Sequence, residues 1–220
     1  MKLSVRDVAK LLNKDESTIY GWIRQGKIPV HRINEQSRFS RAEILEWATS
    51  RGIPVSPEMA VAPDEGTPAL PSLVEALETG GVFPHIGGAD KAGVLRSVVD
   101  AMYLPEEVDR DFLYQVLLAR ETLGSTGIGD GIAIPHIRNP IVMHLDKPVI
   151  MLCFLDSPIE FGSVDGKPVD ILFTMVSPTV RMHLHLLSRL GFVLQNTAFR
   201  AALKNRLPRD LLLEELARAE

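Results

Sequence analysis

Residues 120–136 read RETLGSTGIGDGIAIPH and form the most informative stretch of the chain. Four glycines fall within eight of its positions, so the backbone can bend closely, and exposed amides in such a loop can bind an anion. The Gly-Lys-Ser/Thr ending of a nucleotide-binding P-loop is missing. Residues 132–134 are apolar and predict a short strand that carries Pro135 and His136 to its end. The stretch therefore predicts a glycine-rich loop that presents a histidine.

Helical and strand-like patterns alternate on both sides of this stretch. Two largely apolar runs, 149–155 and 169–176, predict buried strands. Apolar residues at helical spacing predict helices at 90–102, 106–123, 179–195, 197–205 and 208–219. From about Leu73 onward we therefore expect an α/β fold, with a mostly buried mixed sheet flanked by helices.

The charge and proline content divide the chain into three parts. Its 220 residues are 45% hydrophobic and 24% charged, which is typical of a folded protein and excludes disordered and coiled-coil classes. The net charge is −4, but residues 1–50 carry nine basic against six acidic side chains, a net of +3, which leaves −7 for the remainder. Five prolines lie between 52 and 71. We expect a domain at 1–52, a Pro-rich linker at 53–72 and a second domain at 73–220.

The single cysteine and the hydropathy pattern indicate a cytoplasmic protein. Cys153 has no partner for an internal disulfide and lies in an apolar run, so a buried thiol in a reducing compartment is expected. No apolar stretch approaches the roughly 18 to 20 residues that span a bilayer. The charged N-terminus does not resemble a secretory signal. We expect neither a secreted protein nor a membrane permease.

Two short helices are predicted near the N-terminus. Ser4 and Asp15 each precede a run with apolar residues at helical spacing, which is typical of N-caps. Asn13 lies between the two runs and adopts the left-handed conformation of a tight turn at little cost. Gly26 is expected to end the second helix.

A hairpin and a third helix follow. Residues 28–33 and 38–40 predict two strands joined by the polar turn 34–37. The sequence from Ser40 to Glu43 predicts a capping box that begins the third helix.

This order of elements resembles the excisionase and MerR-like winged helix-turn-helix family, on residues 4–12, 17–29 and 38–40. The resemblance implies that the second helix enters the DNA major groove and that the hairpin contacts the backbone. By position, the implied DNA-contacting residues are Ser17, Thr18, Tyr20, Gly21 and Arg24 on the helix and Arg32 and Arg38 on the hairpin.

Charge argues for weak DNA binding by a single copy. Glu16 and Glu35 lie beside the implied contacts and repel DNA, and a net charge of +3 provides few phosphate contacts. A homodimer with two such modules would recover the affinity. A solvated charged face, or a module reused for protein contact, remains an alternative.

Residues 120–136, together with the segment 183–188, resemble the mannitol/fructose-type enzyme IIA domain of the phosphoenolpyruvate-dependent phosphotransferase system, including its nitrogen-regulatory branch. The resemblance covers roughly 73–218 and implies that HPr, or its nitrogen-branch counterpart, phosphorylates His136. A neutral imidazole is a good nucleophile. Donors to the phosphoryl oxygens are expected from Arg120, His183 and the phosphate loop Gly124, Ser125, Thr126 and Gly127. We expect a histidine phosphoryl carrier with no cofactor and no metal ion.

Two positions depart from the family pattern. Asp130 stands where Asn is frequent and places an anion near the loop. Arg138 follows the histidine in a segment where glycine is common, and it is a further candidate contact for the phosphoryl group or the donor protein. His185 lies about 200° around the helix from His183, so the two cannot both face His136. The other histidines match no motif and are expected to be structural or exposed; they are His31, His85 and His144.

Three functions remain open at this point. In the first, the phosphorylation state of His136 reports carbon, nitrogen or energy status and alters DNA or partner binding by the N-terminal module. In the second, the protein is a phosphocarrier for the IIB component of a separate sugar uptake system. In the third, it regulates other proteins without binding DNA. A DNA-binding-like module, which transport does not need, favours the first.

Overall fold

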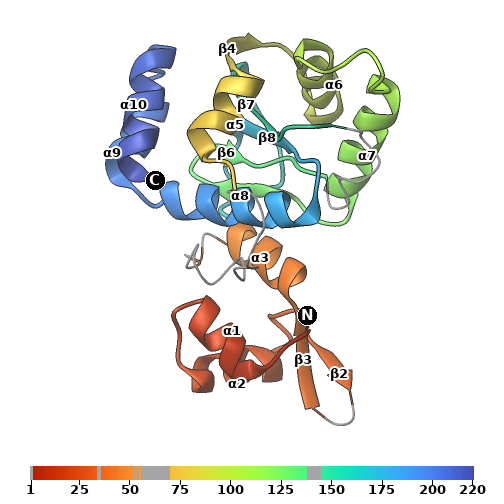
Figure 1. The fold of residues 1–220 in the computed structure, drawn as a ribbon, viewed down its shortest axis with the longest axis vertical. Coiled ribbons are helices and arrows are strands. Elements are labelled where there is room, and N and C mark those ends of the chain that lie inside the picture. Colours follow the sequence, from red (N-terminus) through yellow and green to blue (C-terminus); the bar gives the residue numbers. More distant parts are fainter. Residues whose placement is uncertain (1, 34–35, 52, 54, 56–69, 138–144) are drawn as a thin grey trace.

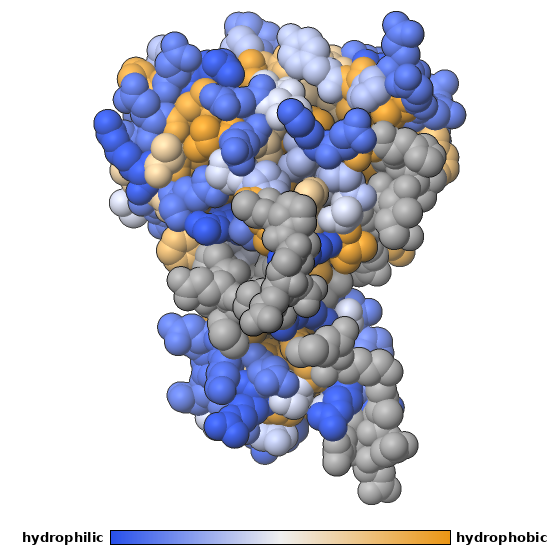
Figure 2. Space-filling model, viewed as in Figure 1, coloured by the Kyte–Doolittle hydropathy of each residue, from blue (hydrophilic) through white to orange (hydrophobic). Residues whose placement is uncertain are grey.

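The computed structural model describes residues 2–33, 36–51, 53, 55, 70–137 and 145–220. Two lobes of unequal size are visible in the space-filling view (Figure 2). The smaller lobe contains the N-terminal elements, and its helix α3 lies next to the larger lobe (Figure 1). Most of the predicted linker lies outside the described residues, so its conformation stays a prediction.

The N-terminal lobe consists of three helices and a small antiparallel sheet. The helices are α1 (Val5–Leu11), α2 (Glu16–Arg24) and α3 (Arg41–Ser50). The strands are β1 (Lys2–Leu3), β2 (His31–Ile33) and β3 (Gln36–Ser40), in the order β1-β3-β2. The predicted helix-turn-helix and hairpin are therefore confirmed, and β1 is an additional strand.

Local signals fix most of the helix ends in this lobe. Ser4 forms a capping box with Asp7, and Asn13 has a φ of 48° in the turn between α1 and α2. Gly26, with a φ of 63°, follows the end of α2 as predicted. Asp15 is the N-cap of α2 but makes no side-chain capping bond.

The predicted capping box at Ser40 is wrong. Helix α3 begins where expected, but the Ser40 side chain accepts no capping hydrogen bond. Glu43 instead lies 2.6 Å from the Nε2 atom of His31 on the hairpin. A tertiary partner has replaced the local one.

The larger lobe is built on a five-stranded mixed sheet in the order β4-β7-β8-β6-β5. The strands are β4 (Val82–Ile86), β5 (Gly127–Gly129), β6 (Ile132–Ala133), β7 (Val149–Ile159) and β8 (Val169–Val176). Strand β4 is parallel to β7 and β6 is parallel to β8, whereas the pairs β7–β8 and β5–β6 are antiparallel. The predicted mixed sheet is confirmed.

Helices cover both faces of this sheet (Figure 1). They are α5 (Leu73–Gly80), α6 (Lys91–Ala101), α7 (Arg110–Thr122), α8 (Val180–Val193), α9 (Thr197–Lys204) and α10 (Arg209–Ala219). Side chains of α5, α8, α9 and α10 form one buried core with the sheet. Those of α6 and α7 form a second core against the opposite face. The result is a three-layered α/β domain.

The predicted helix bounds were mostly correct, with one clear difference. Helix α7 begins at Arg110 and not near Glu106, because the Asp109 side chain accepts a hydrogen bond from the Phe112 amide and caps the helix there. Strand β7 also extends beyond the predicted apolar run, to Ile159.

The two lobes meet where α3 packs on α8. A Cβ atom added to Gly191 of α8 would lie 3.4 Å from the Thr49 side chain of α3, so the helices approach closely there. Leu184 of α8 packs against the hydrophobic core of the N-terminal lobe. The N-terminal lobe thus rests on the helix that also carries His183.

Candidate functional site

His136 lies just beyond strand β6, in the centre of the interface between the lobes. Beyond the end of β6, His136 still pairs in parallel with Met175 of β8. The Met175 amide donates a hydrogen bond to the Pro135 carbonyl oxygen at 2.9 Å. The side chain of His136 is buried, and its Nδ1 atom lies 2.7 Å from the carbonyl oxygen of Ile134. Since a carbonyl oxygen only accepts, Nδ1 carries a proton, and in the neutral imidazole the electron pair is then on Nε2.

His183 faces His136 from helix α8. Their ring centroids are 5.3 Å apart, and 2% of the surface of His183 is exposed. Neither ring nitrogen of His183 has a hydrogen-bond partner among the described residues. The pKa of His183 is lowered to about 4, mainly by burial; the Glu46 carboxylate opposes this shift and the Arg120 guanidinium adds to it. His183 is therefore neutral at physiological pH.

Glu46 of α3 closes the site from the N-terminal lobe. Its Oε1 atom lies 3.9 Å from Nε2 of His136, and its Oε2 atom lies 3.8 Å from a guanidinium nitrogen of Arg120. Only 7% of Glu46 is exposed. The sequence does not single out this residue, because it stands between the apolar residues Leu45 and Trp47 of the third helix. A carboxylate flanked by buried apolar residues was the available signal.

Arg120, at the end of α7, reaches the same point from the other side. Its guanidinium donates to the Gly124 carbonyl oxygen at 2.8 Å, and its side chain is 11% exposed. This bond holds the cation at the entrance of the glycine-rich loop. The structure therefore brings the predicted residues Arg120 and His183 together with the unpredicted Glu46 around His136.

The glycine-rich loop is folded onto protein groups in this structure. The Thr126 amide and hydroxyl both bond to the buried Glu121 carboxylate, and the Ser125 hydroxyl donates to the Phe161 carbonyl oxygen at 2.6 Å. The Gly127 amide donates to Ser125 Oγ at 3.0 Å. These groups are not directed at His136, so their role as phosphate ligands stays a prediction.

Gly127 is required by packing. A Cβ atom at this position would lie 2.8 Å from Cα and 2.4 Å from Oγ of Ser163. Gly124 differs, because it is exposed with a φ of 145° and has open space around it. It lines a cavity of about 370 Å³ between the lobes, together with Ser125, Arg120 and Glu46.

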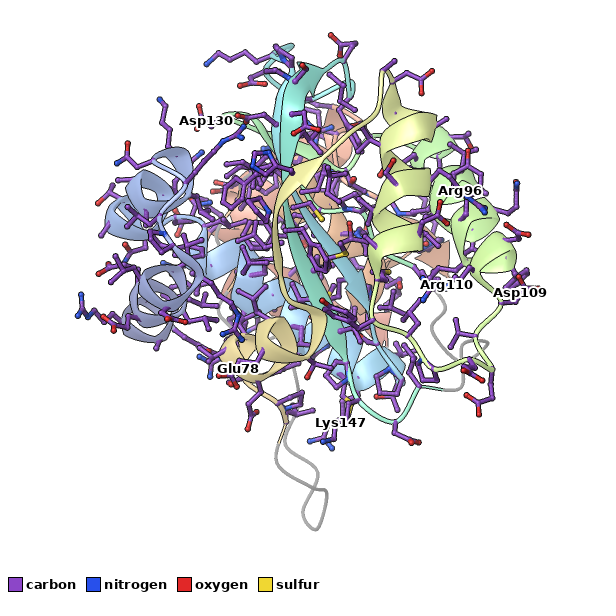
Figure 3. All side chains as sticks on the ribbon, turned by 90° about the horizontal axis from the view of Figure 1, so that it is seen from above. Glu78, Arg96, Asp109, Arg110, Asp130 and Lys147 are labelled. Carbon is purple, nitrogen blue, oxygen red and sulfur yellow. The ribbon has the colours of Figure 1, made fainter. Side chains whose placement is uncertain are left out.

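Asp130 points away from the histidines. It lies in the β5–β6 turn with a φ of 51°, is exposed, and pairs with Arg200 of α9 and with Lys167. Figure 3 shows Asp130 at the outer edge of the sheet, on the side of α9. The anion that replaces the usual Asn is therefore neutralised by surface cations.

Among the described residues, the other histidines lie outside the site. His185 faces the linker end, with Nε2 3.2 Å from the Pro71 carbonyl oxygen, and the arrangement on α8 agrees with the predicted separation from His183. His31 and His85 are exposed and pair with Glu43 and Asp156. His144 and Arg138 lie outside the described residues.

The candidate DNA-contacting residues belong to helix α2 and to the β2–β3 hairpin. Helix α2 and the β2–β3 hairpin extend away from the larger lobe (Figure 1). Four of the seven are exposed, whereas Thr18, Gly21 and Arg38 are half-buried; the exposed ones are Ser17, Tyr20, Arg24 and Arg32. The acidic side chain of Glu16 is exposed beside them.

Comparison with known proteins agrees with this architecture. The family model for the phosphoenolpyruvate-dependent sugar phosphotransferase system, EIIA 2, matches residues 75–218. The chain belongs to this EIIA 2 family. A helix-turn-helix domain model matches residues 3–52, so this EIIA 2 protein carries an N-terminal helix-turn-helix domain.

Individual relatives of this EIIA 2 protein include nitrogen regulatory proteins. That of Pseudomonas aeruginosa is 36% identical over 137 residues, which cover 60% of this chain and 86% of the relative. That of Escherichia coli is 40% identical over 87 residues, 39% of this chain and 50% of the relative. The crystal structure of the nitrogen regulatory protein IIA-Ntr from Neisseria meningitidis is 25% identical with a TM-score of 0.55, covering 61% of this chain and 92% of that one.

Among the described residues, none of the helices of this EIIA 2 protein combines the length and apolar character needed to cross a membrane.

Proposed function

We propose that this protein is a cytoplasmic regulator in which His136 accepts a phosphoryl group from an HPr-type phosphocarrier, and that phosphorylation releases the N-terminal lobe from the larger lobe. The observation that supports the proposal is the position of Glu46. A carboxylate of the DNA-binding-like domain lies 3.9 Å from the nitrogen that would be phosphorylated.

The protonation of His136 selects the accepting atom. Nδ1 holds its proton against the Ile134 carbonyl oxygen at 2.7 Å, which leaves the electron pair on Nε2 for attack. In the transfer, the bond between phosphorus and a nitrogen of the phosphocarrier histidine breaks as the bond between phosphorus and Nε2 of His136 forms. The carrier histidine leaves with the electron pair of the broken bond, and the Nδ1 proton stays in place.

Two neighbours can stabilise the added charge. Arg120 presents a guanidinium, the side chain best suited to phosphoryl oxygens. His183 is neutral, so one of its ring nitrogens carries a hydrogen that can be donated to the phosphoryl group. Both residues already surround the carboxylate of Glu46.

Glu46 makes phosphorylation and docking mutually exclusive. A phosphohistidine carries roughly two negative charges at this point, and a buried carboxylate at the same place would be both sterically and electrostatically opposed to it. Arg120 would exchange Glu46 for the phosphoryl group, and α3 would lose its polar anchor on the larger lobe. Phosphorylation is thereby converted into a change in domain arrangement.

The N-terminal domain is the expected output. Its exposed helix α2 and hairpin are free to contact DNA in the docked state, and a second copy would supply the affinity that a single module with few cations lacks. The docked α3 favours this regulatory function over that of a simple phosphocarrier for a IIB partner. His136 is 3% exposed in the docked arrangement, so any phosphoryl donor must reach it when the lobes are apart, and a simple phosphocarrier has no use for that separation.

The first test is the mass of the intact protein after incubation with phosphoenolpyruvate, enzyme I and a phosphocarrier. We expect an acid-labile increase of about 80 Da that is absent in His136→Ala. No increase with any of several phosphocarriers would contradict the proposal.

Tryptophan fluorescence tests the coupling. The chain has two tryptophans, Trp22 and Trp47, and both lie in the N-terminal lobe, with Trp47 lining the cavity between the lobes. We expect phosphorylation of His136 to shift their emission to longer wavelength as Trp47 becomes hydrated. Stoichiometric phosphorylation with unchanged emission, together with rapid transfer to a IIB domain, would instead identify a phosphocarrier.

A further inference from the structure

Three metal-ligating side chains from three separate elements meet in the interface between the lobes. Glu46 comes from α3, His136 follows β6, and His183 comes from α8. One ligand atom of each residue can be chosen so that all three lie within 4.8 Å of one another. The three residues are 7%, 3% and 2% exposed, respectively.

His183 requires an explanation that a structural role does not supply. Both of its ring nitrogens are buried without a hydrogen-bond partner among the described residues, and an unsatisfied buried polar group costs free energy. The ring is directed at His136, with 5.3 Å between the centroids. A ligand placed between the two rings would satisfy one of these nitrogens.

The ligand set matches a transition-metal dication of the zinc type. Two imidazole nitrogens and one carboxylate oxygen, with one position open, are a recurrent zinc environment. Bonds of about 2.0 to 2.2 Å in tetrahedral geometry separate the ligand atoms by roughly 3.4 Å. The distance between Glu46 Oε1 and His136 Nε2 is 3.9 Å, so a contraction of a few tenths of an ångström suffices for this pair.

The second layer of the site is also in place. A metal-bound histidine usually donates its other ring N–H to a carbonyl or carboxylate, which fixes the orientation of the ring. The Nδ1 atom of His136 has this bond to the Ile134 carbonyl oxygen at 2.7 Å. In the neutral ring the electron pair is then on Nε2, the atom that lies 3.9 Å from Glu46 Oε1.

Arg120 opposes a cation in this position. Its guanidinium lies 3.8 Å from Glu46 Oε2, and it is held by the Gly124 carbonyl oxygen at 2.8 Å. A dication bound to Oε1 would be repelled by this group, so the site should be weaker than a structural zinc site with four protein ligands. The bond to Gly124 uses Nη1, whereas Nη2 is the nitrogen near Glu46, so Arg120 can keep the Gly124 bond when a metal is bound.

We propose that Glu46, His136 and His183 form a binding site for a zinc-type dication that fastens the N-terminal lobe to the larger lobe. The metal uses Nε2 of His136, so it also blocks that atom from phosphorylation. The site does not depend on phosphoryl transfer, because its ligands are all present in the unmodified protein.

Metal titration of the full-length protein, without an affinity tag and stripped with a chelator, tests the site. We expect one Zn²⁺ per chain in competition with a chromophoric chelator, and one Co²⁺ with the visible absorption of a four- or five-coordinate ion. Glu46→Gln and His183→Gln should each weaken Zn²⁺ binding at least about tenfold, the size of effect that even outer partners of a metal show.

Matched controls lie on the same helices. Glu43→Gln is one turn away on α3, where the carboxylate pairs with His31, and His185→Gln is two residues further on α8, where the ring faces Pro71. Both should retain the wild-type affinity for Zn²⁺. Binding that survives Glu46→Gln and His183→Gln, or the absence of stoichiometric binding, would overturn the site. The Co²⁺ spectrum of the wild-type protein decides the case even when a histidine variant does not fold.

The outcome is separable from that of the proposed function. A metal-free protein that is phosphorylated on His136 but binds no metal contradicts only the metal site. A protein that binds Zn²⁺ through Glu46 but gains no mass with phosphoenolpyruvate contradicts only phosphorylation. When both hold, Zn²⁺ should slow the phosphorylation of the wild-type protein more than that of Glu46→Gln.

Discussion

The two lobes hold their candidate functional residues in opposite environments. In the larger lobe, His136 and His183 are buried and held by packing, whereas in the N-terminal lobe, Tyr20 and Arg24 are exposed on α2. A buried site acts through fixed geometry and protonation, and it responds to changes of a few tenths of an ångström. An exposed basic face acts through the number of its charges and responds to salt. The same docked arrangement covers the first site and leaves the second open.

The largest expected contrast is the response to acid. The unfolded chain protonates His183 below its ordinary pKa of 6.5, but the folded protein does so only near pH 4. Between these values the unfolded state binds more protons, so the free energy of unfolding falls as the pH is lowered. At about 1.4 kcal/mol per pKa unit, the loss approaches roughly 3 kcal/mol at pH 4.

Chemical denaturation at a series of pH values, with a chelator present, measures this loss. His183→Gln and His183→Asn should both flatten the pH dependence between 6.5 and 4. A slope identical to that of the wild type would show that folding does not lower the pKa of His183.

The next largest contrast is in the effect of glycine substitutions on the stability of each lobe. Gly127→Ala places a methyl group within 2.8 Å of Ser163 Cα, which should destabilise the larger lobe by about 2 kcal/mol. Gly21→Ala on α2 meets nothing within 4 Å and should stabilise its helix by about 0.5 to 1 kcal/mol. Thermal or denaturant unfolding of the two variants measures both effects. Equal effects at the two positions would contradict the packing role of Gly127.

Weakening the contact between the lobes should open the buried site. Gly191→Leu extends a side chain into Thr49 of α3 without touching the histidines, and we expect about a tenfold faster phosphorylation of His136, equivalent to roughly 1.4 kcal/mol of lost docking. Gly191→Ala is the matched control, because its Cβ would lie 3.4 Å from Thr49 at ordinary contact distance. An unchanged rate in Gly191→Leu would show that docking does not limit access.

The smallest effect is expected on the exposed face. Arg24→Ala should reduce DNA affinity by about 1 kcal/mol and lower the slope of log K against log salt by about one. Fluorescence anisotropy with duplexes selected from a randomised pool measures both. Lys204→Ala, an exposed cation on α9, is the control and should change neither. Equal losses in both variants would indicate binding through overall charge and not through α2.

Most of the fold was predictable because its signals are local. Asn13, Gly26 and the Ser4 capping box determine backbone conformation within a few residues, and the two apolar runs become the central strands β7 and β8. Local signals gave a wrong prediction where a tertiary partner competed with a local one. Glu43 pairs with His31 and does not form the predicted capping box at the start of α3.

Only part of the candidate site could be predicted from the sequence. The family resemblance placed Arg120, His136 and His183, and the structure brings all three together. Glu46 completes the group across the domain interface, ninety positions before His136, and no spacing rule connects residues that meet only when two lobes dock. The loop hydroxyls of Ser125 and Thr126 show the converse, because residues expected to face the histidine are held by Phe161 and Glu121.

Cys153 offers a practical route to the movement of the lobes. It lies in the middle of β7 with no exposed surface, and burial raises the pKa of its thiol, so it will not react with maleimides in the folded protein. Lys14→Cys and Glu107→Cys would therefore carry a pair of fluorophores on a chain whose native thiol need not be removed. The separation of the dyes, followed in single molecules, would report opening and closing directly.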